Sequence, residues 1–419
     1  MSFKTNDVEQ LSLFDSFLNL TAREQKALEN SWAKVFAEEV FPKIDEKPFA
    51  VLYSDKASRP NTPVNVIIGA CIIKELFDYS DDELVEGLML DLRLQYALHT
   101  TSFTEQPLSD KTLSRFRRRC YDYEQTHGVD LYKAAIQNYN KEIAKMMELD
   151  GKIRRMDSLM INSNMLLNPT DPEATYRRKA GKEYRGYVTN VEETVGKNGS
   201  VVTSYEYESN IHSDSQFIKE HLEALPKQEE NTSMIVDGAY YSEEAETMAA
   251  EKNIELLPTA LTAKKNRRDV SGFEMDEEKT KAIKCPAGNT PRSCCYKKSN
   301  DEFKITFDRD VCANCPHKEQ CHAKIFKNIA RVLITKKSLI RLALEERMSS
   351  ETYNLYRRIR NGVETIPSIL RKNYHLEKLP RGKQRGRFFF GSKIAALNFR
   401  KLFHYVKGSS NYAENPLLA

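Results

Sequence analysis

Three acidic residues occupy settings in which carboxylates often do chemistry. Asp157 follows the short run 152–156 and Asp237 follows the apolar run 234–236, so both are predicted at the ends of strands. Glu364 is predicted in the first turn of a helix. Two strand-end carboxylates and a third on a helix can hold a pair of Mg²⁺ ions, which promote the cutting and joining of phosphodiesters. The sequence therefore predicts an enzyme that processes DNA.

The surroundings of Glu364 add positive charge to this set. Asn361 is placed to cap the predicted helix, and Arg357, Arg358 and Arg360 come just before it. The carboxylate is thus expected among cations that can hold phosphates.

Each acid also has a simpler interpretation. The chain has 60 Asp and Glu residues, and a single one is far more often a cap or a solvated charge than a ligand. Asp237 followed by Gly238 is also an ordinary turn. Asp214 is the main rival to Asp237, whereas the nearby His212 is expected to be structural. The prediction of a site therefore depends on the three contexts together.

A change of hydrophobic period divides the chain. Residues 8–148 are predicted to be helical because apolar residues return at three- and four-residue spacing. From Lys152 onward, turn-bounded runs predict strands and a mixed α/β sheet domain, over 153–161, 184–195, 201–207, 233–236 and 254–257. Further helices are expected over 337–359, 362–373 and 393–405.

Two helix starts are visible in the N-terminal part. Ser80 and Glu83 form a capping-box pattern, and Ser109 is placed to cap a later helix. That later helix is rich in cations that suit phosphate contacts in a helix-turn-helix-like arrangement, namely Lys111, Arg115, Arg117, Arg118 and Arg119. A solvated basic helix face is an equally good interpretation.

Positive charge gathers toward the C-terminus. Residues 321–407 contain 21 Lys and Arg and only 5 acidic residues, although the whole chain has a net charge of +4. This asymmetry indicates a polyanionic partner. Within it, the tract 381–387, which includes Arg381, Lys383 and Arg385, predicts a loop that contacts the phosphate backbone, with a plain solvated loop as the alternative.

Six of the eight cysteines lie between Cys285 and Cys321. Cys312-x-x-Cys315 with Cys285 and Cys321 forms the preferred quartet for a structural Zn²⁺ site, in which His317 or His322 could replace one member. Reduced cysteines packed as small apolar residues are the alternative.

Several motifs together resemble the DDE transposases of bacterial insertion sequences. They are Asp157 in its strand, Asp237-Gly-Ala-Tyr-Tyr, Arg360-Asn-Gly-Val-Glu364, Arg381-Gly-x-x-Arg385-Gly and Ala395-Ala-Leu-Asn-Phe-Arg-Lys-Leu. The stretch from Arg59-Pro60 to the helix after Pro107 is similar to the helical domain that precedes the catalytic core in one large group of that family. Relatives often place a Lys at an offset that Arg371 occupies here.

The resemblance implies a fold, a site and partners. It implies a ribonuclease-H-like catalytic domain in which Asp157, Asp237 and Glu364 bind two Mg²⁺ ions, for which Mn²⁺ can substitute. It implies in-line phosphoryl transfer on double-stranded DNA, both transposon terminal inverted repeats and target DNA, by a homodimer.

The expected organisation has five segments. They are a helical DNA-binding domain over 1–148, the first catalytic part over 149–261, a cysteine-rich insertion over 262–328, the second catalytic part over 329–407 and a tail over 408–419. With no apolar run long enough to span a bilayer, the protein is expected in the cytoplasm at the nucleoid, without a membrane partner. The alternative functions are a domesticated, catalytically silent DNA-binding protein and a zinc hydrolase, which lacks its usual His-Glu-x-x-His spacing here.

Overall fold

The chain is organised as two compact units. A computed structural model describes residues 1–408 except 7–14, 57, 104, 163–170, 172, 180, 260–271 and 277–280. The first unit combines Met1–Leu257 with Ile359–Ala419, and the second is Pro258–Arg358. Among the described helices, no segment is long and apolar enough to cross a membrane.

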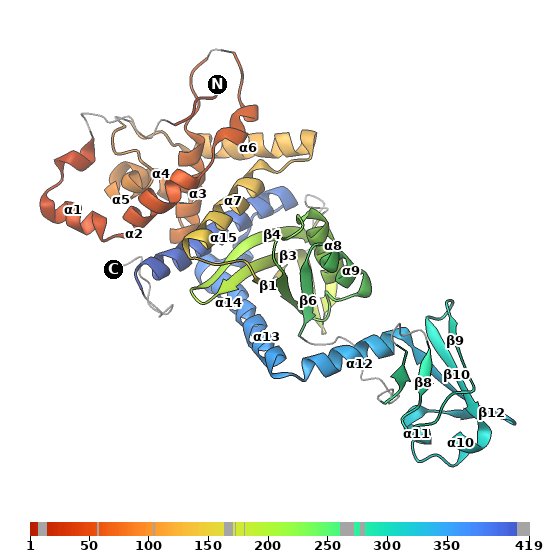
Figure 1. The fold of residues 1–419 in the computed structure, drawn as a ribbon. Coiled ribbons are helices and arrows are strands. Elements are labelled where there is room, and N and C mark those ends of the chain that lie inside the picture. The colour runs from red at the N-terminus through yellow and green to blue at the C-terminus, as the bar shows by residue number, and fades with distance from the viewer. Residues whose placement is uncertain are drawn as a thin grey trace. The chain divides into compact units, whose positions relative to one another are not determined.

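The N-terminal part of the first unit is helical, as predicted (Figure 1). Its helices are α1 (Ala22–Glu29), α2 (Trp32–Val35), α3 (Val64–Phe77), α4 (Asp81–Leu90), α5 (Leu92–Ala97), α6 (Asp110–His127) and α7 (Leu131–Met146). Shorter turns of helix are η1 (Ser16–Asn19), η2 (Phe36–Val40), η3 (Phe41–Lys43) and η4 (Lys47–Leu52). The predicted capping box of Ser80 and Glu83 opens α4, and Ser109 caps α6.

A six-stranded sheet follows the helices. It is built from β1 (Ile153–Asn162), β2 (Thr175–Lys179), β3 (Lys182–Gly196), β4 (Gly199–Ser209), β5 (Thr232–Val236) and β6 (Ile254–Pro258). The order is β2-β3-β1-β5-β6, with β4 also paired to β3. Strand β1 is central, antiparallel to β3 and parallel to β5.

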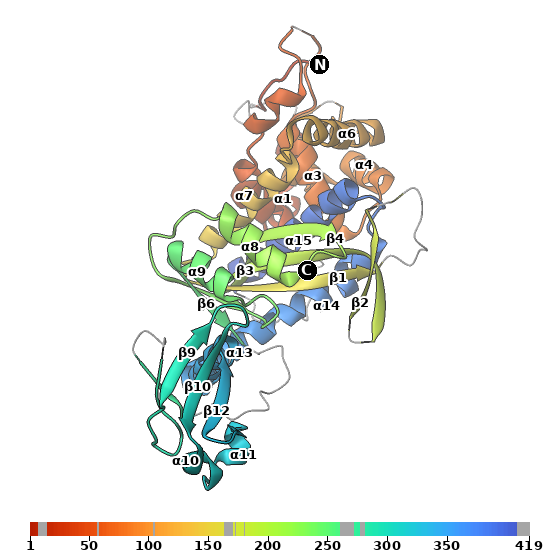
Figure 2. The ribbon, with the colours of Figure 1, turned by 90° about the vertical axis from the view of Figure 1, so that its right-hand side faces the viewer.

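The two faces of the sheet bury different helices, as the alternation along a strand requires (Figure 2). Met156 and Met160 of β1 pack with α8 (Asp214–Ala224) and α9 (Glu243–Glu251). Leu159 and Ile161 face a larger core that also contains the N-terminal helices and α15 (Lys383–Val406). Because α15 packs on α3, α7 and β4, the segment predicted as a separate domain over 1–148 shares one core with the sheet.

The second unit has its own small sheet and core. It contains β7 (Glu274–Met275), β8 (Ala282–Lys284), β9 (Ser293–Lys297), β10 (Glu302–Asp308), α10 (Arg309–Ala313), α11 (Lys318–Cys321), β11 (Lys324–Ile325), β12 (Ile329–Thr335) and α12 (Lys336–Met348). The insertion was expected to end at residue 328. Instead β12 pairs with β10 along its whole length, and the unit continues through the following helices to Arg358. Residues 262–271 and 277–280 of the expected insertion lie outside the described residues.

The chain then returns to the first unit through helices. Helix α13 (Glu351–Asn361) leads into η5 (Gly362–Glu364), α14 (Thr365–Tyr374) and η6 (Leu376–Lys378). The last helix was expected to begin at Lys393, but α15 begins at Lys383 and takes in most of the basic tract that was predicted to be a loop. Of the predicted tail, residues 409–419 lie outside the described part.

Candidate active site

Asp157 lies on β1, and Asp237 directly follows the neighbouring strand β5. Asp157 is within β1 rather than at its end, because β1 continues its pairing with β3 to Asn162. The parallel pairing of β1 with β5 stops at Arg155 and Ile235. Continuing the same register by two residues brings Asp157 level with Asp237, which directly follows β5. The two carboxylates therefore meet where the strands part, the usual place for a site in an α/β sheet.

The charge of Asp157 is poorly compensated. Burial raises the pKa of the Asp157 carboxyl to about 6, against the opposing effects of Arg360 and of the Ser158 N–H, which donates to Oδ1 at 2.9 Å. The negative charges of Asp237 and Asp214 add to the increase in this pKa. On sequence alone, Asp214 was a rival to Asp237. In the structure the two carboxyls are not alternatives, because both raise the pKa of Asp157.

Glu364 joins this cluster through an arginine. The Arg360 guanidinium lies 2.8 Å from Glu364 Oε1 and 3.4 Å from Asp157 Oδ2. The Glu364 side chain is 62% exposed, whereas that of Asp157 is 17% exposed. The expected cap by Asn361 is wrong, because Asn361 makes no side-chain cap bond and the chain stays helical through η5.

Oxygen donors dominate this cluster, which suits a hard cation such as Mg²⁺ or Mn²⁺. In the described part of the chain, no group of three or more His, Cys, Asp or Glu side chains is arranged to hold a metal ion. At the acidic cluster, the Arg360 cation lies between the carboxylates of Asp157 and Glu364. The chemistry of the donor set fits a divalent cation, whose charge would compete with that of Arg360.

The cations predicted to contact DNA have different environments. Lys111, Arg115 and Arg118 are exposed on one face of α6, at spacings of four and three residues. The neighbouring Arg117 is instead paired with Asp81 at 2.6 Å, and Arg119 lies over the Tyr53 ring. The arginines of α6 therefore fall into two groups: Arg117 and Arg119 contact other parts of the protein, whereas Arg115 and Arg118 face solvent.

The other predicted DNA contacts are more dispersed. Arg381 and Arg385 are exposed beside the start of α15, whereas Lys383 is paired with Glu208 at 2.6 Å. Arg357 belongs to the second unit, where it donates to the Thr259 carbonyl. Arg371 donates to the carbonyl of Met160 at 3.0 Å, three residues after Asp157 on β1.

The four predicted zinc ligands line one small cavity of the second unit, together with His317. Burial raises the pKa of the Cys312 thiol, and the neighbouring Cys285 and Cys315 raise it further. A metal bound here would have to displace the thiol protons, which the raised pKa of Cys312 opposes. Cys295, outside the quartet, is exposed.

Two residues that the sequence analysis did not single out also lie at the acidic cluster. The Tyr240 hydroxyl donates to Asn190 Oδ1 at 2.8 Å, and its backbone N–H donates to the Asp237 carbonyl at 3.0 Å. Arg155 lies two residues before Asp157 on the same face of β1. The only sequence signal for either was its nearness to a predicted carboxylate.

Comparisons with known proteins agree on a family. Residues 284–403 match the family model described as "Transposase DDE domain", and residues 23–119 match "Transposase domain (DUF772)". A comparison with curated proteins returned no match. The chain is also similar to one in a "Crystal structure of a pre-cleavage Mos1 transpososome", with 9% identity over 74% of this chain and 97% of that one, but the TM-score of 0.17 supports no argument about fold.

In the sequence, the two matched segments lie on either side of the six-stranded sheet, and the second of them contains Glu364. On these two family matches, the chain belongs to the DDE transposases.

Proposed function

We propose that the protein cleaves and joins DNA strands at insertion-sequence ends by in-line phosphoryl transfer. The observation that carries this proposal is the placement of three acids around Asp157. Asp237 follows β5, level with Asp157 in the continued register of the two strands, and Arg360 contacts both Asp157 and Glu364. These acids are far apart in the sequence, and bringing them together costs folding free energy because like charges repel. Such a cost is typical of functional sites.

The sheet supports a ribonuclease-H-like assignment within this proposal. Its five-strand path β4-β3-β1-β5-β6 has three antiparallel neighbours followed by a parallel partner of β1. Asp157 is on the central strand of this path and Asp237 follows the parallel partner. The second unit then interrupts the sheet domain before Glu364, as a cysteine-bearing insertion.

Asp157, Asp237 and Glu364 are the residues that would hold two Mg²⁺ ions, with Mn²⁺ as a substitute. When bound, such ions activate the attacking oxygen and stabilise the leaving oxygen of a phosphodiester. Arg360 would then be released to contact a phosphate of the DNA, because the cations would replace it as partner of the carboxylates. Lys111, Arg115 and Arg118, with Arg357, Arg381, Lys383 and Arg385, would contact the phosphate backbone of transposon ends and target DNA.

Two further elements of the proposal come from the family resemblance and the cysteine cavity. Synapsis of two transposon ends would require a homodimer. A structural Zn²⁺ held by Cys285, Cys312, Cys315 and Cys321 would fold the second unit and take no part in catalysis.

The competing function is a catalytically silent DNA-binding protein. The acidic cluster argues against it, because a purely DNA-binding surface gains nothing from crowded carboxylates near phosphates. The test is strand cleavage and strand transfer of labelled DNA carrying the element's ends with Mg²⁺, together with a separate measurement of DNA affinity.

The variants for this test are Asp157→Ala, Asp237→Ala and Glu364→Ala, with Glu251→Gln on the exposed end of α9 as the matched control. We expect all three alanine variants to lose at least about 100-fold in rate while binding DNA normally. A wild-type protein that binds the ends but never cleaves them would favour the silent protein.

A further inference from the structure

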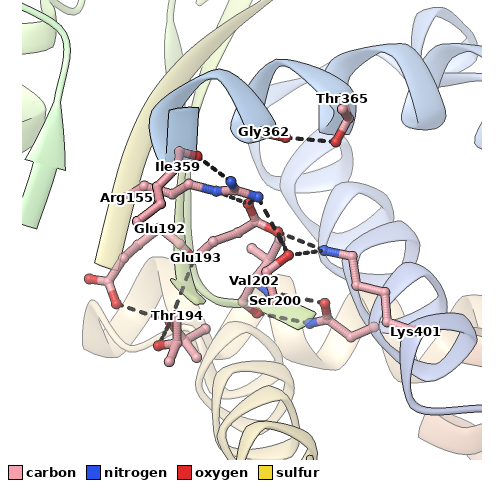
Figure 3. A network of polar contacts seen from close by, with 12 residues as sticks. Arg155, Glu192, Glu193, Thr194, Ser200, Val202, Ile359, Gly362, Thr365 and Lys401 are labelled. Atoms are coloured by element: carbon pink, nitrogen blue, oxygen red, sulfur yellow. Dashed lines mark hydrogen bonds and ion pairs between the residues drawn. The ribbon is translucent and has the colours of Figure 1, made fainter. Parts of the chain in front are cut away.

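A buried ionic network lies directly beneath the turn that presents Arg360 and Glu364 (Figure 3). Its centre is Glu193 of β3, which is fully buried and is the cross-strand partner of Arg155. The Arg155 guanidinium donates to Glu193 Oε2 at 2.6 Å, and Lys401 of α15 donates to Glu193 Oε1 at 2.6 Å. Ser200 also donates to Oε1, at 2.9 Å.

This network holds the guanidinium of Arg155 in one place. A buried carboxylate with two cationic partners is stable only while its geometry is kept, because loss of a partner leaves an uncompensated charge. Although burial by itself would raise the pKa of Glu193, Lys401 and Arg155 lower it below its ordinary value. Glu193 is therefore an anion that fixes Arg155 from the core side.

The remaining arm of Arg155 reaches the catalytic turn. Its Nη1 donates to the carbonyl of Ile359, the residue directly before Arg360. The same guanidinium lies against Gly362, where an added Cβ would be 2.2 Å from Nη1 and 3.1 Å from Cζ. Thr365 closes the other side of the turn by donating to the Gly362 carbonyl at 2.7 Å. The turn is thus held from both ends.

We propose that Arg155 is a positioning residue that fixes the Ile359–Gly362 turn and so places Arg360 and Glu364 beside Asp157. The inference rests on the proposed function, since it concerns the same acidic cluster. Arg155 and Asp157 share one face of β1, two residues apart, so the strand that carries one carboxylate also anchors the backbone that carries another. Gly362 is required because any side chain there would displace the guanidinium from the Ile359 carbonyl.

The test compares Gly362→Ala and Arg155→Lys with Arg154→Lys. Arg154 is the adjacent arginine of β1, on the opposite face, where it contacts Glu192 and Gln228. Lysine at position 155 keeps the charge facing Glu193, but its single ammonium group cannot also serve the Ile359 carbonyl. Gly362→Ala keeps the Arg155 side chain but places a methyl group where its guanidinium now lies.

The first readout is binding of Mn²⁺ alone to the full-length protein, followed by electron paramagnetic resonance, and the second is strand cleavage. We expect Gly362→Ala and Arg155→Lys to weaken Mn²⁺ binding about 10- to 100-fold at a temperature where both variants are folded, with DNA affinity close to wild type. Both variants should also lose thermal stability, because they disturb a buried ion pair. Arg154→Lys should bind Mn²⁺ like wild type. In the Arg155→Lys background, Gly362→Ala should add less than about twofold, because the residue it displaces has already lost its contact.

Different failures have different meanings. If wild type binds Mn²⁺ and cleaves DNA, and Gly362→Ala does both equally well, the positioning role is overturned while the proposed function stands. If the two substitutions act additively, the coupling between Arg155 and Gly362 is overturned. If wild type neither binds Mn²⁺ nor cleaves DNA, the proposed function fails and the positioning role fails with it.

Discussion

Asp157 combines a rigid position with an unfavourable charge. The pairing of β1 with β3 fixes its backbone, while burial and the nearby Asp237 and Asp214 oppose its ionisation. The ionised carboxylate therefore destabilises the metal-free protein, and a bound cation would remove this destabilisation. The sequence predicted Asp157 and Asp237 as strand-end members of one site. The apolar run before Asp237 marks the end of β5, whereas Asp157 lies within β1. It could not predict Arg155, because the role of that residue depends on cross-strand register. Asp214 was recognised only as a rival to Asp237, because its place beside Asp157 depends on a helix start far along the chain.

Replacing Asp157 by Asn should stabilise the metal-free protein at high pH. The pKa of Asp157 is about 6 in the folded state, against about 3.9 in an unfolded chain. The folded state therefore binds this proton more tightly, and the penalty of ionisation grows as pH rises from about 4 to about 6. We expect Asp157→Asn to raise the free energy of unfolding by up to about 3 kcal/mol at pH 8 and by less than about 0.5 kcal/mol at pH 4.

Denaturant unfolding in the presence of EDTA measures this difference, with Glu251→Gln as control. A larger gain at pH 4 than at pH 8 would show that the charge of Asp157 is not destabilising.

At the scale of the element, α15 shows why part of the fold escaped prediction. The tract 381–387 was predicted as a loop, and the segment before Lys393 also contains Gly386 and Gly391, although glycine disfavours helix interiors. In the structure both glycines lie inside α15, against the hydroxyl ends of Tyr207 and Tyr205 of β4. The close approach of helix and strand is a tertiary requirement with no local signature. The capped starts of α4 and α6, by contrast, depend on local residues and were predicted correctly.

Gly391→Ala should destabilise the protein even though alanine favours helices. A Cβ at this position would lie 2.2 Å from the Tyr205 hydroxyl oxygen in a fully packed core. We expect a loss of about 2–4 kcal/mol, which reverses the gain of about 1 kcal/mol that alanine gives in an exposed helix. Tyr205→Phe removes that oxygen and should recover part of the loss in the double variant. A neutral Gly391→Ala in denaturant unfolding would contradict this packing.

The exposed face of α6 should contribute to DNA affinity without sequence preference. Replacing Lys111, Arg115 and Arg118 together by Gln removes three phosphate-binding charges from the solvent side of the helix. We expect weaker binding. We also expect the slope of log K against log[salt] to become shallower by about 3, because three fewer phosphate contacts release fewer counterions. Filter binding at several salt concentrations measures both quantities. Unchanged affinity would mean that this face is only a solvated surface, as the simpler interpretation holds.

At the scale of the whole molecule, the chain is a folded unit interrupted by a second one. The first unit needs residues from both ends of the chain, since α15 completes the core that the N-terminal helices begin. The sequence revealed the interruption through its cysteines and turns. It missed the end of the second unit because β12 and the following helices continue the unit without any change in composition.

Zinc removal should affect the second unit alone. If Cys285, Cys312, Cys315 and Cys321 hold Zn²⁺, native mass spectrometry should find one zinc per chain, and Cys315→Ser should abolish it. Hydrogen exchange should then increase over the described parts of 258–358 and stay unchanged in the sheet that carries Asp157. Cys295→Ser, at an exposed cysteine outside the quartet, is the matched control. Zinc retained in Cys315→Ser would remove that residue from the site.

The most direct test of the central claim is a change of metal preference at the three acids. Asp157→Cys, Asp237→Cys and Glu364→Cys each replace a hard oxygen ligand by a softer thiolate, which accepts Mn²⁺ more readily than Mg²⁺. The measurement is strand cleavage of end-bearing DNA in each metal. We predict that every variant is inactive with Mg²⁺ and is partly restored by Mn²⁺. Full activity of any of them with Mg²⁺ would contradict the claim that this acid holds the catalytic cation.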